Sequence, residues 1–231
     1  MHSTFSEHLV RAAVTAVLLS LGALLGACGD RKLGPNVPSS ILLVSGDSQT
    51  VLAGDHATAP LVAQVNNTEG VPLPNVEVRW AVVSGGGSLL TLVDTTNANG
   101  QVLSTYLSPA VAGLAKVSAA SGGAANTFFV TVAADTTGQL TAYAGDGAAA
   151  LVGYQLTLVV KAVDRFGNPM QGVDVSWNTS SGLLQASSGV TDSTGKASNV
   201  VTVGPDTGKV SIVASSRFNA VTFNVSALQG R

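Results

Sequence analysis

The sequence is poor in cysteine and in charge. Cys28 is the one cysteine among 231 residues, so no disulfide can form within a chain and core packing must hold each domain together. Charged residues are only 10% of the chain, and the formal net charge is −2. This excludes the basic surface that attracts nucleic acid or an anionic membrane, and we expect no nucleic-acid partner. With 45% hydrophobic residues, the chain is too apolar to be disordered.

Residue types that carry catalysis are also scarce. His56 is the only histidine after the first 27 residues, so a Ser-His-Asp device or a histidine metal site would have to use it. It follows Asp55 ahead of an expected strand, which favours an exposed turn residue. Asp135, Asp164 and Asp192 fall in expected loops without the alternating acidic spacing of a calcium site. We expect no enzyme, cofactor or metal site, and leave calcium at these aspartates open.

The N-terminus has the pattern of a secretory leader. Residues 12–25 are apolar except for two hydroxyl residues, and are too short to span a bilayer comfortably. The leader ends in Leu25-Gly26-Ala27-Cys28, which resembles the lipobox of bacterial lipoproteins. The resemblance implies cleavage between Ala27 and Cys28 and lipid on the Cys28 thiol. The alternatives are an ordinary signal with an unrelated cysteine, or an uncleaved anchor. The position of the single cysteine favours the lipoprotein.

This resemblance implies a domain order and a location. Residues 1–27 would be the signal peptide and residues 28–39 a lipidated N-terminus and tether, with the membrane as the partner of the lipid on Cys28. Gly29 follows the cysteine, where an aspartate would favour retention at the inner membrane. By resemblance to diderm lipoproteins, we therefore expect the outer membrane.

One string of residues occurs twice. Glu69–Trp80 returns as Phe166–Trp177, 97 positions later (177 − 80 = 97), and a repeat of that length indicates two domains. The residues shared by the two copies include Gly70, Pro72 and Trp80 in the first, and Gly167, Pro169 and Trp177 in the second. Each copy predicts a Gly/Pro turn and then a strand that points its tryptophan inward, as in the core of an Ig fold. A sugar-stacking role for the tryptophans is the alternative.

The period of two predicts antiparallel strands across both copies, in domains at residues 40–134 and 135–231. Asn99-Gly100 predicts a hairpin between residues 89–96 and 101–107. Thr96–Gly100 corresponds to Thr191–Gly195 at an offset of 95 (195 − 100 = 95). We therefore assign structural turns to Gly70, Pro72, Gly100, Gly167, Pro169 and Gly195.

Three shared features identify a family resemblance. The Gly-x-Pro…Val-x-Val-x-Trp motif, the Thr-x-x-x-Gly turn, and a late Lys-Val pair at Lys116 and Lys209 resemble bacterial Ig-like domains of the invasin/intimin (Big-1) type. The resemblance covers nearly all of the chain after residue 39. It implies an all-β protein of two tandem immunoglobulin-like antiparallel β-sandwiches, about seven strands each.

Two other strings have bland interpretations. Gly145–Ala150 fits the Gly-x-Gly-x-x-Gly/Ala string of dinucleotide sites, but no helix follows it, so we interpret it as a turn. Phe129 is predicted to face outward, where it would mark a contact patch or the seam between the domains, although a single exposed aromatic residue usually needs no explanation.

The preferred hypothesis is a non-enzymatic, lipid-anchored envelope protein that serves as a spacer, adhesion or protein-interaction module with a protein or cell-surface partner. A glycan- or peptidoglycan-binding accessory module is the second hypothesis, and it requires outward aromatics or a polar groove. A hydrolase is the third, and the chain lacks a suitable pair of base and nucleophile.

Overall fold

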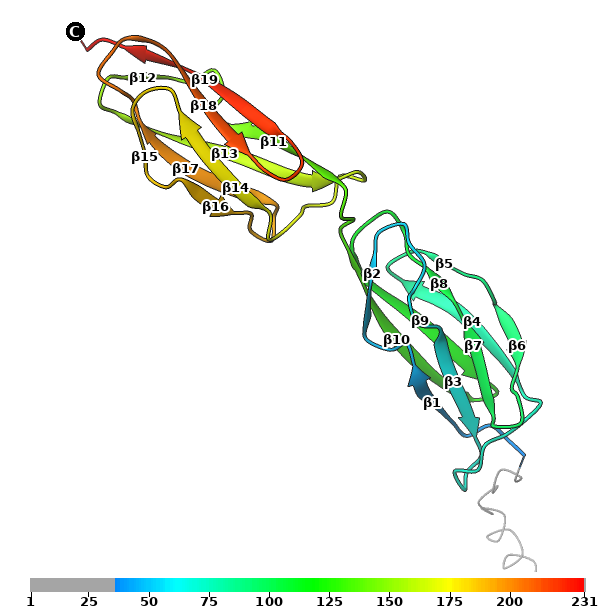
Figure 1. The fold of residues 1–231 in the computed structure, drawn as a ribbon. Coiled ribbons are helices and arrows are strands. Elements are labelled where there is room, and N and C mark those ends of the chain that lie inside the picture. The colour runs from blue at the N-terminus through cyan, green and yellow to red at the C-terminus, as the bar shows by residue number, and fades with distance from the viewer. Residues whose placement is uncertain (1–35, 231) are drawn as a thin grey trace, which may run out of the picture. The chain divides into compact units, whose positions relative to one another are not determined.

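The computed structural model describes residues 36–230, in which strands, turns and loops account for every residue. From Pro38 onward the described chain folds into two β-sandwiches (Figure 1). The predicted all-β class is confirmed for these residues. No helix within residues 36–230 is long and apolar enough to cross a membrane. Cys28, Ala27 and the residues that precede them lie outside the described residues.

The first sandwich contains β1 to β10. Their bounds are Ser40–Ser45, Gln49–Leu52, Leu61–Asn66, Glu77–Ser84, Ser88–Leu89, Val93–Thr95, Gln101–Ser104, Tyr106–Leu107, Gly113–Ser121 and Ala124–Ala133. One sheet has the order β1-β3-β7 and the facing sheet the order β2-β10-β9-β4-β6, while β5 pairs with β8 alone.

The second sandwich contains β11 to β19. Their bounds are Gly138–Ala144, Ala149–Leu151, Gln155–Asp164, Asp174–Thr179, Leu183–Leu184, Ser188–Val190, Lys196–Thr202, Gly208–Ser215 and Ala220–Leu228. One sheet has the order β11-β13-β17-β15 and the other the order β12-β19-β18-β14-β16.

Alternation along the strands builds one core in each sandwich. On β4, Val78 and Trp80 are buried while Glu77 and Arg79 are exposed, so every second side chain points between the sheets. The buried apolar residues of each sandwich form a single cluster. Because no disulfide is available, these clusters and the ladders carry the stability, with roughly 1.5–3 kcal/mol for each fully buried large apolar side chain.

The first strand of each copy is split between the two sheets. β1 pairs antiparallel with β3, whereas β2 pairs parallel with β10; β11 and β12 do the same with β13 and β19. This split, together with several strands of two or three residues, raises the strand number above the predicted seven or so. At the switch turns Asp47 and Asp146 accept hydrogen bonds, both of 2.8 Å, from the backbone nitrogens of Phe129 and Asn224.

The hairpin predicted at Asn99-Gly100 is wrong. β6 pairs with β4 in one sheet and β7 pairs with β3 in the other, so the turn is a crossing between sheets. Asn97 shapes this turn locally, because its Oδ1 accepts the backbone N–H of Asn99 and of Gln101. An Asn-Gly turn therefore fixes a reversal of the chain but leaves the strand partners open.

The proposed correspondence of Lys116 with Lys209 is also wrong. Trp80 lies opposite Ala119, and Trp177 lies opposite Ala214, so the strands correspond at an offset of 95 (214 − 119 = 95). Lys116 then corresponds to Ser211, which moves the lysine pair out of register by two residues. Lys-Val therefore recurs by chance, and the two lysines occupy different positions on the outer faces of the two sandwiches.

Candidate interaction surfaces

The two repeated motifs meet in space within each sandwich. The Thr96 hydroxyl donates to the Leu73 carbonyl at 2.6 Å and accepts the N–H of Val76 at 2.9 Å. Gly100 lies against the same turn, since its carbonyl accepts the N–H of Val65 at 2.9 Å. The Thr-x-x-x-Gly turn therefore locks the Gly-x-Pro turn, which is a structural role.

The predicted turn glycines differ in their surroundings. Gly70 and Gly167 have φ values of 79° and 89°, and an added Cβ would meet nothing within 4 Å. Gly100 and Gly195 have φ values of 69° and 75°, and an added Cβ would lie 2.9 Å from the Leu73 nitrogen in one case and 2.4 Å from the Ala162 oxygen in the other. Gly70 and Gly167 are needed only for the positive φ of the turn. Gly100 and Gly195 are also needed because the neighbouring backbone leaves no room for a Cβ.

The prolines of the motif lie beside the strand that precedes the turn. Pro72 forms an isolated antiparallel bridge with Asn66, and Pro169 forms the same bridge with Val163. Each proline thus returns the chain against β3 or β13 without needing a backbone donor of its own.

Both tryptophans lie in the cores. Trp80 is 3% exposed and Trp177 is 5% exposed, with ring centroids 5.7 Å from Phe128 and 6.0 Å from Phe223. Neither indole Nε1 has a hydrogen-bond partner. The side chains are therefore placed where a ligand could not stack on them.

The aspartates considered for calcium are engaged by the protein. Asp164 ends β13 and is buried, and its two carboxylate oxygens accept bonds from four N–H groups, those of Phe166, Asp135 and Asn168, the last with both backbone and side chain. Burial raises the pKa of Asp164, but the hydrogen bonds outweigh it and the pKa is lowered. Asp135 forms an ion pair with Arg165 at 2.5 Å. Residues 36–230 contain no group of three or more His, Cys, Asp or Glu side chains suited to a metal.

Asn168 is a residue that the sequence did not single out. Its Nδ2 donates to the Ala110 carbonyl at 2.7 Å, and its Oδ1 accepts the Ala112 N–H at 2.9 Å. The same Nδ2 donates to Asp164 at 2.8 Å. The first copy has Val71 at this position, so comparing the two motif turns residue by residue would have identified it.

His56 has no chemical partner for hydrolysis. It forms an isolated bridge with Leu107, and the N–H of its neighbour Asp55 donates to the Ser108 hydroxyl at 3.1 Å. That hydroxyl in turn donates to the Leu52 carbonyl at 2.6 Å. The Ser108 hydroxyl therefore caps the turn that contains Asp55.

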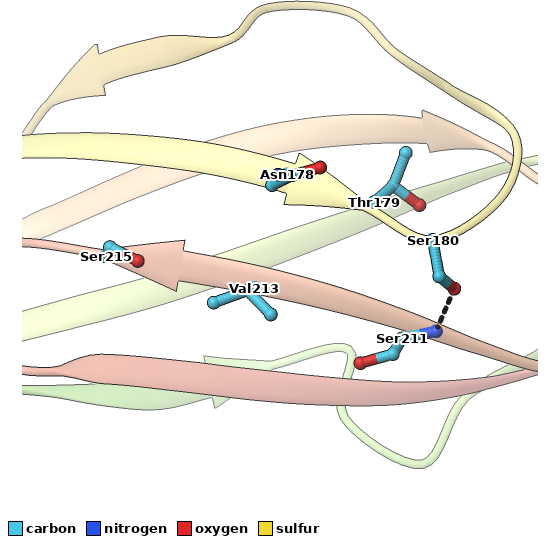
Figure 2. A pocket seen from close by; sticks show the side chains of 6 residues that line it. All are labelled: Asn178, Thr179, Ser180, Ser211, Val213 and Ser215. Carbon is cyan, nitrogen blue, oxygen red and sulfur yellow. Dashed lines mark hydrogen bonds between the residues drawn. The ribbon is translucent and has the colours of Figure 1, made fainter.

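A shallow polar hollow lies on the outer face of β14 and β18 (Figure 2). Its volume is about 390 Å³, and it is lined by Asn178, Thr179, Ser180, Ser211, Val213 and Ser215. The Ser211 N–H donates to the Ser180 hydroxyl at 3.0 Å and closes one end. Neutral hydroxyl and amide groups suit hydrogen bonding to a polar ligand, but nothing here supplies charge or an aromatic surface.

The opposite sheet of the second sandwich has a different outer face. Lys161 on β13 lies directly opposite Lys196 on β17. The Lys196 Nζ lies 3.9 Å from the ring centroid of Tyr143, a residue that is 55% exposed. Hydrogen bonding and charge from Lys196, with a further contribution from the charge of Lys161, lower the pKa of Tyr143. This is an outward aromatic residue beside two cations, which the strand patterns alone did not reveal.

Phe129 gives a smaller patch on the first sandwich. It is 41% exposed, and the Lys116 Nζ lies 5.7 Å from its ring centroid across the β9–β10 ladder. Its N–H is held by Asp47. The exposed ring of Phe129 thus lies beside one lysine, whereas the ring of Tyr143 is influenced by two.

Comparison with known proteins agrees with this architecture. Residues 146–226 match the family model of the bacterial Ig-like domain (group 1). The chain is similar to InvD of Yersinia pseudotuberculosis, with 17% identity over 82% of this chain and 58% of that chain, at a TM-score of 0.56. For the Escherichia coli adhesin FdeC, the identity is 14% over 80% of this chain and 63% of that one, at a TM-score of 0.48. For the D0-D1 domain of intimin, the values are 22%, 83% and 97%, at 0.35. A search of curated proteins gave no match.

Residues 36–230 therefore form two tandem Ig-like β-sandwiches. Within the second sandwich, residues 146–226 match the bacterial Ig-like domain of group 1, which confirms the predicted resemblance to the Big-1, invasin/intimin type for these residues. The match covers 58% of the InvD chain at 17% identity, so the similarity shows a shared fold only.

Proposed function

We propose that this protein is a lipid-anchored, non-enzymatic component of the cell envelope whose tandem Ig-like domains act as a spacer and as an adhesion or protein-interaction module. The observation that carries the proposal is Cys28, the only cysteine, at the end of Leu25-Gly26-Ala27-Cys28. A lipidated cysteine followed directly by a tether and sandwich domains is an arrangement for display.

In this proposal the domain order follows the sequence. Residues 1–27 are removed, residues 28–39 carry the lipid and the tether, and residues 40–134 and 135–231 form the two domains. Several acyl chains on one cysteine give durable anchoring, whereas a single chain binds only marginally. Gly29 favours export to the outer membrane.

The interaction role is supported by the fold of the described residues. Ig-like sandwiches offer sheet faces, edge strands and end loops, and partners bind such surfaces without any catalytic group. The group 1 match over residues 146–226 supports an envelope setting and a protein or cell-surface partner.

The anchor is tested by Cys28→Ser in the full chain. We expect the unchanged chain in the membrane fraction, released by detergent, with a mass that shows cleavage before Cys28 and added lipid. Cys28→Ser should move to the soluble fraction without that mass. Gly29→Asp serves as the matched variant, because it should stay lipidated while shifting toward the inner membrane. Retention of Cys28→Ser with the membrane would contradict the proposal.

A second candidate function is a glycan-binding accessory module of the envelope. The observation that favours it is the Tyr143 ring beside Lys161 and Lys196, because this hypothesis requires an outward aromatic group. It is developed below.

A further inference from the structure

The outer face of the sheet β11-β13-β17-β15 carries two lysines that form no ion pair within residues 36–230. Lys161 and Lys196 occupy directly opposite positions, where like charges destabilise a sheet. The ion pairs found within residues 36–230 are Arg79–Glu77 and Arg165–Asp135, so neither lysine has a carboxylate in contact. A ligand with a negative charge between the two ammonium groups would relieve their repulsion.

The nearest carboxylate is already occupied. Asp192 precedes β17, and its Oδ1 accepts bonds from the Thr194 N–H, the Thr194 hydroxyl and the Lys196 N–H. These bonds and the Lys196 charge, with the Thr194 hydroxyl as the largest cause, lower the pKa of Asp192. The carboxylate thus shapes the turn and reaches Lys196 through its backbone, which leaves the ammonium group facing outward.

Tyr143 is aimed at the lysine pair by an irregularity of β11. The register with β13 shifts between Ala142 and Ala144, so Tyr143 is the extra residue of a bulge. Bulges redirect a side chain out of the regular pleat. The Lys196 Nζ lies over the Tyr143 ring although β13 runs between their strands, so the ring and both ammonium groups form one patch.

The rest of this face is neutral. The outward residues of β13 and β17 beyond the lysines are Gln155, Thr157, Val159, Ser198, Val200 and Thr202. A hollow of about 330 Å³ lies at their far end, lined by Gln155, Leu183, Leu184, Gln185, Val200 and Thr202. Val200 lies four positions after Lys196, so the hollow lies roughly 13 Å from the charges along the strand. Amide and apolar groups at that spacing suit an extended ligand whose acidic group lies at one end.

The first sandwich supplies a comparison within the same chain. The strand pairings place Gln64 where the second copy has Lys161, Gln101 where it has Lys196, and Val44 where it has Tyr143. Gln101 donates to Gln64 at 3.5 Å. The same fold is therefore built with neutral residues at these three positions, and the charged patch is not a requirement of the sandwich.

We propose that the outer face of β11-β13-β17-β15 is a binding site for an acidic polysaccharide, with a carboxylate of the sugar between the ammonium groups of Lys161 and Lys196. The Tyr143 ring provides an apolar edge for a sugar ring, and the amides of Gln155 and Gln185 bond sugar hydroxyls in the hollow. This inference rests on the proposed interaction function and names its partner class.

The pairing of the strands favours a sugar over a peptide. β13 lies between β11 and β17, and β17 lies between β13 and β15, so the backbone groups at the centre of this face are already bonded. A peptide that adds a strand needs an open sheet edge, which in this sheet is β11 or β15 and not the strands that carry the two lysines. The face offers only side chains, with charge at one end and hydroxyl and amide groups at the other, which is the chemistry of an acidic sugar chain.

The test is a titration of the purified full chain with a hexameric uronic-acid oligosaccharide. Neutral oligosaccharide of the same length and hexaglutamate are the comparison probes. We expect uronate binding that weakens with salt, little binding of the neutral sugar, and weaker binding of hexaglutamate. Each of Lys161→Gln and Lys196→Gln should weaken uronate binding roughly two- to fivefold. Tyr143→Val should also weaken uronate binding, because it removes the apolar contact between the tyrosine ring and the sugar ring. The introduced glutamines and valine are the residues that the first sandwich has at the corresponding positions.

Lys116→Gln with Lys209→Gln is the control, since it changes the net charge as much as Lys161→Gln combined with Lys196→Gln. It should bind as the unchanged chain does, and thermal unfolding should show all variants folded. Gln64→Lys with Gln101→Lys and Val44→Tyr should add binding to the first sandwich. Equal loss in the control, equal binding of hexaglutamate, or no uronate binding would each overturn the proposal. These readings do not depend on the lipid, so failure here leaves the fractionation of Cys28→Ser unaffected.

Discussion

The hydroxyl of Thr96 lies 2.6 Å from the carbonyl oxygen of Leu73, and this one contact joins the two motifs that the sequence repeats. Thr191 makes the same bond to Met170 at 2.6 Å and accepts the N–H of Val173 at 2.9 Å. Both threonines are buried. A single side chain thus satisfies a donor and an acceptor in the turn that leads into the tryptophan strand.

Replacing Thr191 by valine should destabilise the chain by about 1–3 kcal/mol, because the backbone groups of Met170 and Val173 lose their partner in a buried place. Valine has nearly the same shape as threonine, so the loss of stability measures the contribution of the hydroxyl group. Denaturant unfolding measures it, and Thr191→Ser, which keeps the hydroxyl, should lose clearly less. Equal stability of Thr191→Val and the unchanged chain would show that the bond is dispensable.

The tryptophans should be needed for volume rather than for their N–H group. Trp80→Ala or Trp177→Ala should cost roughly 3–5 kcal/mol through the cavity each leaves. Trp80→Phe should cost clearly less, since the Nε1 atom has no bond to lose. Unfolding in denaturant, followed by circular dichroism, gives both values, because the tryptophan that remains in each variant lies in the core of the other sandwich. If Trp80→Ala left stability unchanged, the core assignment would fail.

The sequence predicted what is local. The period of two placed Val78 and Trp80 inward, because alternation along a strand directly states which side chains face the core. It did not predict that β6 and β7 join opposite sheets, since turn chemistry at Gly100 fixes a reversal and the pairing is settled by packing against Pro72 and Leu73.

The lysine face was missed for a related reason. Lys161 and Lys196 become neighbours only through the β13–β17 register, and Tyr143 joins them only through a bulge. A residue-by-residue alignment of the two copies would have flagged Gln64 against Lys161. The misplaced Lys116–Lys209 match concealed how the copies differ.

The two kinds of turn glycine should respond differently to alanine. Gly167→Ala should cost roughly 1–2 kcal/mol, for the positive φ alone, since its surroundings are open. Gly195→Ala should cost more, because the added Cβ would also lie 2.4 Å from the Ala162 carbonyl, which is backbone and does not move freely. Thermal unfolding of the two variants side by side gives the comparison. Equal losses of stability would show that the backbone around Gly195 moves to accommodate the added Cβ without a further cost in free energy.

Asp164 should give the second sandwich a dependence on acid. Its folded pKa is lowered, with burial opposing and the bonds from Asn168, Asp135 and Phe166 prevailing. A lowered folded pKa means that the ionised carboxylate stabilises the fold above the unfolded value of about 3.9, and that this contribution is lost as the pH falls through the folded pKa.

Asp164→Asn tests this with the residue of the first copy, where Asn67 Oδ1 accepts the N–H of Glu69 and Val71 much as Asp164 Oδ1 accepts those of Phe166 and Asn168. The variant should be less stable at pH 7, because the amide nitrogen that replaces Oδ2 can accept neither of the two hydrogen bonds that Oδ2 accepts from Asp135 and Asn168. It should also lose less stability than the unchanged chain between pH 5 and acid conditions, in denaturant titrations at each pH. Asp192→Asn controls for the other lowered aspartate, which is fully exposed and should matter less. Parallel pH profiles for Asp164→Asn and the unchanged chain would assign the acid sensitivity elsewhere.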